Sequence, residues 1–112
     1  MLDNGLFTVF SSDRPCSSGA PLLGIHAAVN RKSKSGQSYG LREAISPEEA
    51  LRLYTINGAY TTFEEGIKGS IEVGKLADLV VLAGDPTKCD SENIKDIPVV
   101  ATLVGGKVLY EK

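Results

Sequence analysis

The chain has 112 residues, a length that suits one small domain. Its 12 lysines and arginines and 14 aspartates and glutamates give a formal net charge of −2, and 42% of its residues are hydrophobic. This balance argues against a disordered chain and against a nucleic-acid-binding protein, which would carry a basic stripe. No apolar run approaches the ~18 residues that span a bilayer, and the N-terminus lacks a signal-peptide pattern. We therefore expect a cytoplasmic protein that binds neither nucleic acid nor membrane.

The cysteines and the one histidine predict no metal site by themselves. Cys16 and Cys89 form no C-x-x-C pair, and His26 lies in an apolar helical pattern. A zinc site of the Cys/His kind needs about four such ligands. We expect His26 to be packed or partly exposed, and two thiols fit a reducing compartment, although a disulfide between them stays open.

The first predicted strand comprises residues 6–10, which are rich in aromatic and β-branched side chains. Their continuous apolar character indicates burial on both faces, as in a parallel sheet. Such a strand needs parallel neighbours, and the rest of the chain does not supply them. Asp13 follows this strand at the position where α/β barrels place catalytic groups. The alternative is an aspartate that only caps the loop.

Two helical stretches follow in the first half. Residues 22–29 carry apolar side chains at helical spacing. Residues 46–49 form a capping box, in which Ser46 is the N-cap and Glu49 reaches back to its amide. The helix that begins there either continues through a weak point at 57–58 or gives way to a second, shorter helix. We expect Tyr54 and Tyr60 to be core residues.

The second half of the chain has the periodicity of strands. We expect a short strand at 69–74, a buried strand at 77–82, and a loop or a single helical turn at 87–97. Two further strands, 99–104 and 107–110, are separated by a glycine pair that predicts a tight hairpin.

The stretch 69–76 nearly matches a phosphate-binding loop, but Leu76 replaces the hydroxyl residue and Glu72 would repel phosphate. We interpret it as a hairpin turn at Gly74 and Lys75.

The order of these motifs resembles the C-terminal part of a metal-dependent amidohydrolase. The most similar branch contains the YtcJ-like enzymes and those that cleave formamides or N-acyl amino acids. The most specific segment is 69–82, which reads G-x-I-x-x-G-K-x-A-D-L-V-V-L. The resemblance covers essentially the whole chain and is carried by residues 9–15, 22–31, 45–59, 69–82 and 102–108.

The resemblance implies an α+β fragment. Residues 1–65 would be the last strand and outer helices of a (β/α)8 barrel, and residues 66–112 the C-terminal strands of a composite β-sandwich. Asp13 would match the family's aspartate, which binds a divalent metal, most simply zinc, and shuttles a proton while an amide-type small molecule is hydrolysed. The family's H-x-H pair and further histidines are absent from this sequence, which holds one histidine.

We therefore expect a fragment of a hydrolase of C–N bonds that neither holds the metal nor is active alone, with Asp13 as its single catalytic group. Two alternatives stay open. In the first alternative, the chain is a non-catalytic module that forms a homo-oligomer or a strand-exchanged dimer through its sheet. In the second, it is a subunit that completes a split hydrolase.

Overall fold

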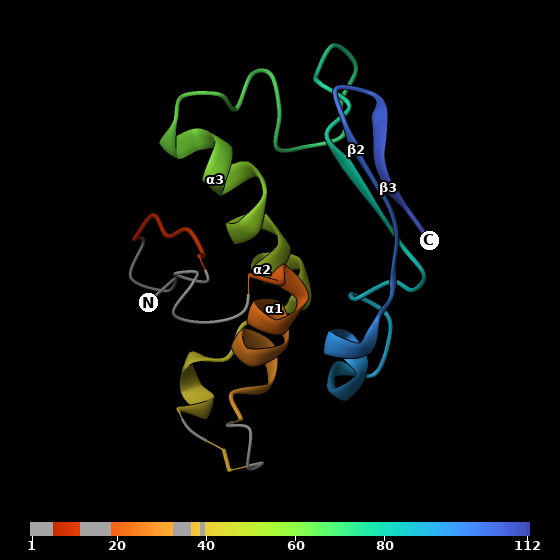
Figure 1. The fold of residues 1–112 in the computed structure, drawn as a ribbon. Coiled ribbons are helices and arrows are strands. Elements are labelled where there is room, and N and C mark those ends of the chain that lie inside the picture. Colours follow the sequence, from red (N-terminus) through yellow and green to blue (C-terminus); the bar gives the residue numbers. More distant parts are fainter. Residues whose placement is uncertain (1–5, 12–18, 33–36, 39) are drawn as a thin grey trace.

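The computed structural model describes residues 6–11, 19–32, 37–38 and 40–112, which form a helical half and a sheet half (Figure 1). Among these residues no helix is long and apolar enough to cross a membrane. The helical elements are α1 (Pro21–Asn30), the 3-10 helix η2 (Leu41–Glu43), α2 (Pro47–Tyr54), α3 (Ile56–Thr61) and the 3-10 helix η3 (Ser91–Asp96). The strands β1 (Leu79–Leu82), β2 (Val99–Val104) and β3 (Lys107–Glu111) form one antiparallel sheet in the order β1-β2-β3.

Helix α2 begins at the predicted capping box. The amide of Glu49 donates to the Ser46 hydroxyl at 3.1 Å, and the Ser46 amide donates to the Glu49 carboxylate at 3.4 Å. Of the two arrangements that the sequence left open, the structure has the second, because α3 follows as a separate short helix. The interruption is at Thr55 (φ −113°, ψ −93°) and not at 57–58, which lie inside α3.

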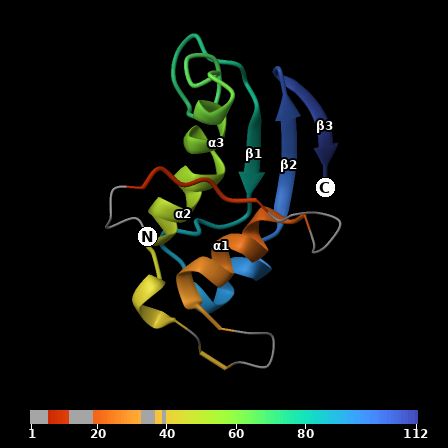
Figure 2. The same cartoon turned by 90° about the vertical axis from the view of Figure 1, so that its left-hand side faces the viewer.

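The helical half contains the core. Ile25 of α1, Ala50 of α2 and Ile94 of η3 are almost fully buried and pack together, with Leu53 only 3% exposed. Figure 2 shows α1 lying beside both α2 and η3, which places η3 under the first helix. The predicted helix at 22–29 and the helical turn within 87–97 are thereby confirmed.

The β2–β3 hairpin is confirmed, and its turn uses the glycine pair in the left-handed region, with φ of 58° at Gly105 and 83° at Gly106. Two residues that precede β1 hold this turn. The Gly105 amide donates to the Asp78 carboxylate at 2.8 Å, and the Gly106 amide donates to the Ala77 carbonyl at 3.0 Å. The hairpin turn is therefore fixed to the residues that lead into β1, the strand paired with β2.

The prediction that β1 is buried is wrong. Val80 is 54% exposed and Val81 46% exposed, and every residue of β3 is exposed. Among the described strands, only Ala101 of β2 is buried. The reason is that the described residues place no second layer against most of this sheet (Figure 1).

The predicted strands at 6–10 and 69–74 are also absent from the structure. Residues 6–10 form no strand, and Leu6 and Phe7 are more than half exposed, because no described strand lies alongside them. Residues 69–74 are bends and a turn, because Gly69 and Gly74 have φ of 100° and 93°, which an extended strand does not tolerate. The turn predicted there exists, closed by the Lys75 amide on the Glu72 carbonyl at 3.1 Å, but it joins no pair of strands.

Candidate functional site

Asp13, the predicted catalytic residue and metal ligand, lies outside the described residues, as does Cys16. The structure does describe the segment that leads to it, residues 6–11. Figure 2 shows this segment crossing the helices near the junction of α2 and α3. The geometry of this crossing is the part of the candidate site that can be built from contacts.

Two hydrogen bonds tie the segment to the helices. The Phe10 amide donates to the carbonyl of Leu53 in α2 at 3.2 Å. The side-chain amide of Asn57 in α3 donates to the carbonyl of Thr8 at 2.9 Å, in a partly buried position. The segment thus takes its backbone partners from helices, where the sequence had predicted neighbouring strands.

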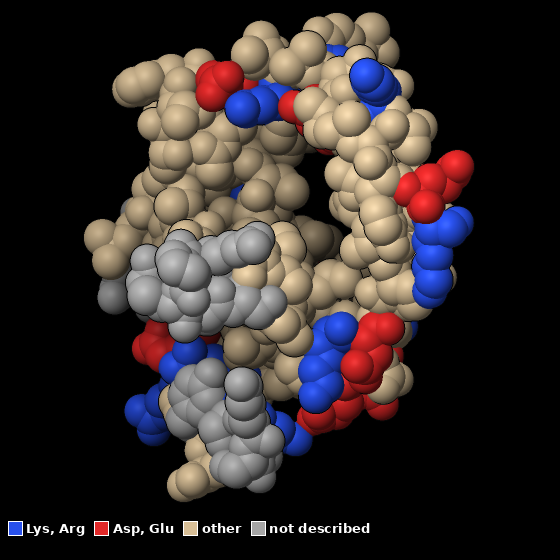
Figure 3. All heavy atoms as spheres, viewed as in Figure 1, with Lys and Arg blue, Asp and Glu red and all other residues tan. Residues whose placement is uncertain are grey.

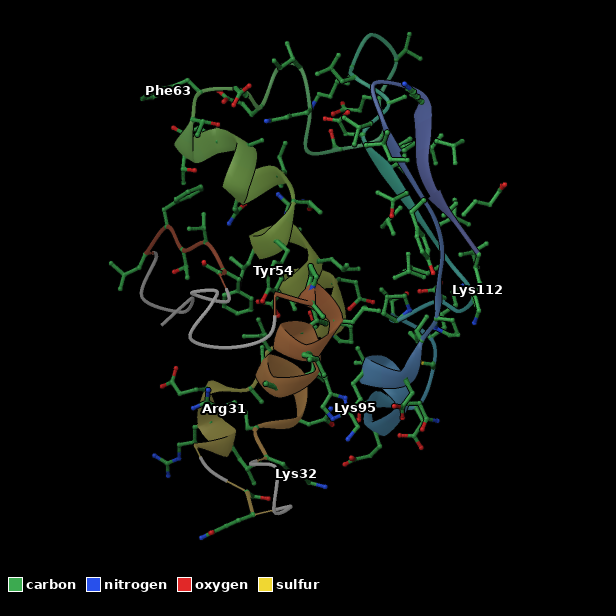
Figure 4. All side chains as sticks on the ribbon, in the orientation of Figure 1. Arg31, Lys32, Tyr54, Phe63, Lys95 and Lys112 are labelled. Atoms are coloured by element: carbon green, nitrogen blue, oxygen red, sulfur yellow. The ribbon has the colours of Figure 1, made fainter. Side chains whose placement is uncertain are left out.

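Two aromatic pairs accompany these bonds. The ring of Phe10 meets the ring of Tyr54 edge-on, with centroids 5.4 Å apart, and the ring of Phe7 lies 4.9 Å from that of Tyr60. Such pairs add about 0.5–1.5 kcal/mol beyond their area burial. Burial raises the pKa of the Tyr54 hydroxyl, which Figure 4 shows at the centre of the helical half. Tyr60 is 52% exposed, so its assignment to the core is wrong.

His26 is a packing residue in this structure, as its sequence context predicts. Its Nδ1 accepts the backbone amide of Lys95 in η3 at 3.3 Å, which links α1 to η3. Asn30 strengthens the same contact, because its side-chain amide donates to the His26 and Ser91 carbonyls at 3.0 and 2.8 Å. Cys89 is free and half-buried against the core.

A cavity of about 530 Å³ separates the helices from β1, and Figure 3 shows the surface hollowed between the two halves. Its wall is mostly apolar. The charged pair at its rim is Glu64 with Lys68, whose Oε1 and Nζ are 3.3 Å apart. Hydrogen bonds from Thr62 and Lys68 hold the pKa of the Glu64 carboxyl below its usual value. The lining residues are Tyr54, Thr55, Gly58, Ala59, Thr62, Glu64, Lys68, Gly69, Ser70, Ile71, Asp78, Leu79 and Val80.

The glycine-lysine segment at 69–76 has a structural role. Lys75 Nζ lies 3.0 Å from the Glu72 carboxylate and 2.7 Å from the Ser70 hydroxyl, so its charge is engaged within the turn. The Ser70 hydroxyl also donates to Glu72. This arrangement agrees with the interpretation of the segment as a turn and not as a phosphate loop.

Sequence reasoning missed two residues that the structure brings into use, Asn57 and Asp78. The sequence at 57–58 indicates only a weak point in a helix, because Asn and Gly have low helix propensity, and it does not predict the contact of Asn57 with Thr8. Asp78 lies in the most specific motif, where it fixes the hairpin turn.

Within the described residues, no group of three or more His, Cys, Asp or Glu side chains could hold a metal ion. The described residues therefore supply no cluster of side chains that could serve as a set of metal ligands. A divalent metal does not fit the described residues alone.

Comparison with known proteins identifies what the chain is similar to. The family model described as "Amidohydrolase family" matches residues 1–110. The chain is 38% identical over 112 residues to the N-substituted formamide deformylase of Arthrobacter pascens. This match covers 100% of this chain and 21% of that protein. It is 36% identical to the putative amidohydrolase YtcJ of Bacillus subtilis, again over 100% of this chain and 22% of that protein.

A crystal structure of an amidohydrolase from Thermotoga maritima has the same fold over 99% of this chain and 24% of that one, with a TM-score of 0.76 and 24% identity. The chain thus spans about a fifth of the length of the curated relatives it matches.

Proposed function

The chain belongs to the amidohydrolase family, and we propose that it supplies the C-terminal part of a metal-dependent hydrolase of amide-type C–N bonds in small molecules. The observation that carries this proposal is the similarity along the whole chain to a relative named for removing the formyl group from N-substituted formamides. A second relative is named a putative amidohydrolase.

We propose further that residues 1–65 belong to the barrel domain and residues 66–112 to the β-sandwich domain of that hydrolase. The ring contacts of Phe7 with Tyr60 and of Phe10 with Tyr54 support the first assignment, because a barrel strand packs its side chains against its outer helices. The three-stranded sheet with exposed valines supports the second, because such a sheet has apolar side chains left for another layer.

Asp13 is the residue to which we assign the catalytic carboxylate. It follows the proposed last strand, where barrel enzymes carry their chemistry. A divalent metal bound there, zinc in our proposal, would polarise the substrate carbonyl or acidify a water. We propose that the other donors come from outside this chain, because its sequence holds a single histidine and its described residues hold no group of three or more possible ligands.

The first test concerns the 112-residue chain alone. We expect isothermal titration calorimetry with Zn²⁺ to detect no stoichiometric binding. We also expect that the chain does not hydrolyse N-substituted formamides. Tight one-to-one Zn²⁺ binding would contradict the assignment of the remaining ligands to a region outside this chain.

The second test places Asp13 within a complete enzyme. In a chimera, the 112 residues replace the matching fifth of the Arthrobacter deformylase. Asp13→Asn is expected to lower kcat by about 10²- to 10⁴-fold, the usual contribution of a general acid or base. Asp90→Asn is the matched control, because Asp90 caps η3 through an oxygen that asparagine also has. Equal activity of Asp13→Asn and Asp90→Asn would refute the assignment.

The exposed sheet favours a second candidate, a non-catalytic module that forms a homo-oligomer or a strand-exchanged dimer. Val80, Val104 and Leu109 are at least half exposed, so all three strands have apolar side chains available to another chain. A subunit that completes a split hydrolase would use the same surface. Light scattering distinguishes these ideas from a monomeric fragment, and co-purification reveals a separate upstream subunit.

A further inference from the structure

Two residues other than glycine have a positive φ in the described part of the chain, Arg31 at 53° and Phe63 at 61°. Each lies at the end of a helix, Arg31 as the C-cap of α1 and Phe63 directly after the C-cap of α3. A β-carbon is disfavoured in this left-handed region, which is why glycine is common at such helix ends. We therefore looked for the contact that offsets the strain at each position.

Phe63 occupies the position of a helix end that most favours glycine. The amide of Glu64 donates to the Ala59 carbonyl at 2.9 Å, and the amide of Phe63 donates to the Tyr60 carbonyl at 3.1 Å. These two bonds form a Schellman motif, in which the residue after the C-cap takes the left-handed conformation. The motif uses only the backbone of Phe63, so glycine would form the same bonds without the steric strain.

The side chains at the two helix ends differ in what they contact. The Nε of Arg31 donates to the Gly40 carbonyl at 3.2 Å, so that side chain is used within the chain. The side chain of Phe63 is 89% exposed, and Figure 4 shows it pointing away from the end of α3. Burial within the described fold therefore does not offset the strain at Phe63.

The carboxylate that follows Phe63 is engaged locally. Glu64 accepts the Thr62 hydroxyl at 2.7 Å, and its Oε1 lies 3.3 Å from Nζ of Lys68. What this helix end offers to a partner is thus an aromatic ring and not the charge of Glu64. Aromatic side chains of this kind are enriched in the buried centres of protein interfaces, where they fill apolar pockets.

We propose that Phe63 is an anchor through which this chain packs against the rest of the hydrolase, with its ring in a pocket of aliphatic side chains there. This inference rests on the proposed function, under which the chain is one part of a longer enzyme. The curated relatives have ample further chain for such a pocket, because the matches cover only 21% and 22% of them. Phe63 also lies two residues before the proposed boundary between the barrel and sandwich domains.

Phe63→Gly tests the anchor in two contexts, the 112-residue chain alone and the deformylase chimera. Hydrogen exchange followed by mass spectrometry, corrected for intrinsic rates, measures the opening of the helix end at 59–64. In the chain alone, we expect glycine to slow this exchange about twofold to tenfold, because it relieves the strain at an exposed position. In the chimera, we expect the same change to speed it at least tenfold, because a buried ring is lost.

Two further variants separate the ring from the backbone. Phe63→Ala keeps the β-carbon and its strain but removes the ring, so we expect less than about a twofold change in the chain alone and at least tenfold faster exchange in the chimera. Arg31→Gly is the matched control at the other helix end. Its effect on exchange at the end of α1 is expected to be the same in both contexts, because the contact of Arg31 with Gly40 lies within the chain.

A Phe63→Gly effect of the same sign in the chain and in the chimera would overturn the proposal, because the ring would then have no partner in the longer enzyme. Light scattering on the chain alone tests a different occupant. A dimer that Phe63→Ala dissociates would assign the ring to a second copy of this chain, and the proposal would be wrong.

The proposed function is judged separately, by Asp13→Asn in the same chimera. If Asp13→Asn is inactive and Phe63→Gly has the same sign in both contexts, the anchor is wrong and the proposed function stands. If Asp13→Asn is fully active while the sign of the Phe63→Gly effect inverts, the catalytic assignment fails and the anchor stands.

Discussion

The helices of this protein bury large side chains, whereas the side chains of the sheet, apart from Ala101, are half-buried or exposed. Ile25, Ala50 and Ile94 are at most 2% exposed, and they come from three different helical elements. In the described strands only Ala101 is buried, and the side chains of β3 all face solvent. The two halves therefore have different sources of stability.

The sheet half relies on polar contacts at its turns. Asp78 holds the hairpin turn, and Lys75 holds Glu72 and Ser70 in the preceding turn. Hydrogen bonds of this kind contribute about 0.5–1.5 kcal/mol each, whereas burial of a large aliphatic side chain contributes more. The polar residues of segment 69–82 therefore have structural roles, because Ser70, Glu72, Lys75 and Asp78 each make a contact that fixes a turn.

The largest expected effect comes from the helical core. Ile25→Ala removes a side chain that is 2% exposed and is expected to lower the free energy of unfolding by about 2–5 kcal/mol. Val108→Ala in β3, at a side chain 50% exposed, is expected to change it by less than about 0.5 kcal/mol. Urea unfolding followed by circular dichroism measures both. Similar losses in the two variants would remove the contrast between the halves.

A smaller effect is expected from the hairpin turn. Asp78→Ala removes the acceptor of the Gly105 amide and is expected to speed amide exchange in β2 and β3 roughly fivefold, with no change in α2. Asp78→Asn keeps an acceptor oxygen and should behave more like the native chain. Faster exchange in α2 as well would mean that the halves are not independent.

The smallest effect is a dependence on pH. The Ser70 hydroxyl and Lys75 hold the pKa of the Glu72 carboxyl below its ordinary value. A lowered pKa in the folded state means that this carboxylate stabilises the fold above the ordinary glutamate pKa of about 4.3, and that the contribution is lost as pH falls through the lowered value. Thermal unfolding between pH 6 and about pH 3 is expected to be slightly less pH-dependent in Glu72→Gln. A steeper dependence in that variant would contradict the sign.

Local signals in the sequence predicted the elements that depend on neighbouring residues. The capping box at Ser46 and the glycine pair at Gly105 each determine their structure within a few positions, and both were confirmed. Asn57 and Gly58 were a poor guide to the end of the helix, because Thr55 interrupts it through its own backbone angles and hydroxyl.

Strand predictions failed where pairing depends on distant residues. Residues 6–10 have the composition of a buried strand, but a strand forms only beside a partner, and the described residues place helices there. The exposure of Val80 has the same cause, since apolar sequence does not say whether a second layer is present. The catalytic role of Asp13 stays a prediction, because this residue lies outside the described residues.

Gly24 of α1 has a practical consequence for anyone engineering this chain. Replacing a helical glycine with alanine usually raises thermal stability. At this position the added methyl would lie 2.9 Å from Cζ of the Tyr54 ring and closer still to its hydroxyl. The missing side chain sets how near α1 approaches that ring, so a consensus redesign that fills this gap would push the first helix away from the tyrosine and loosen the helical half.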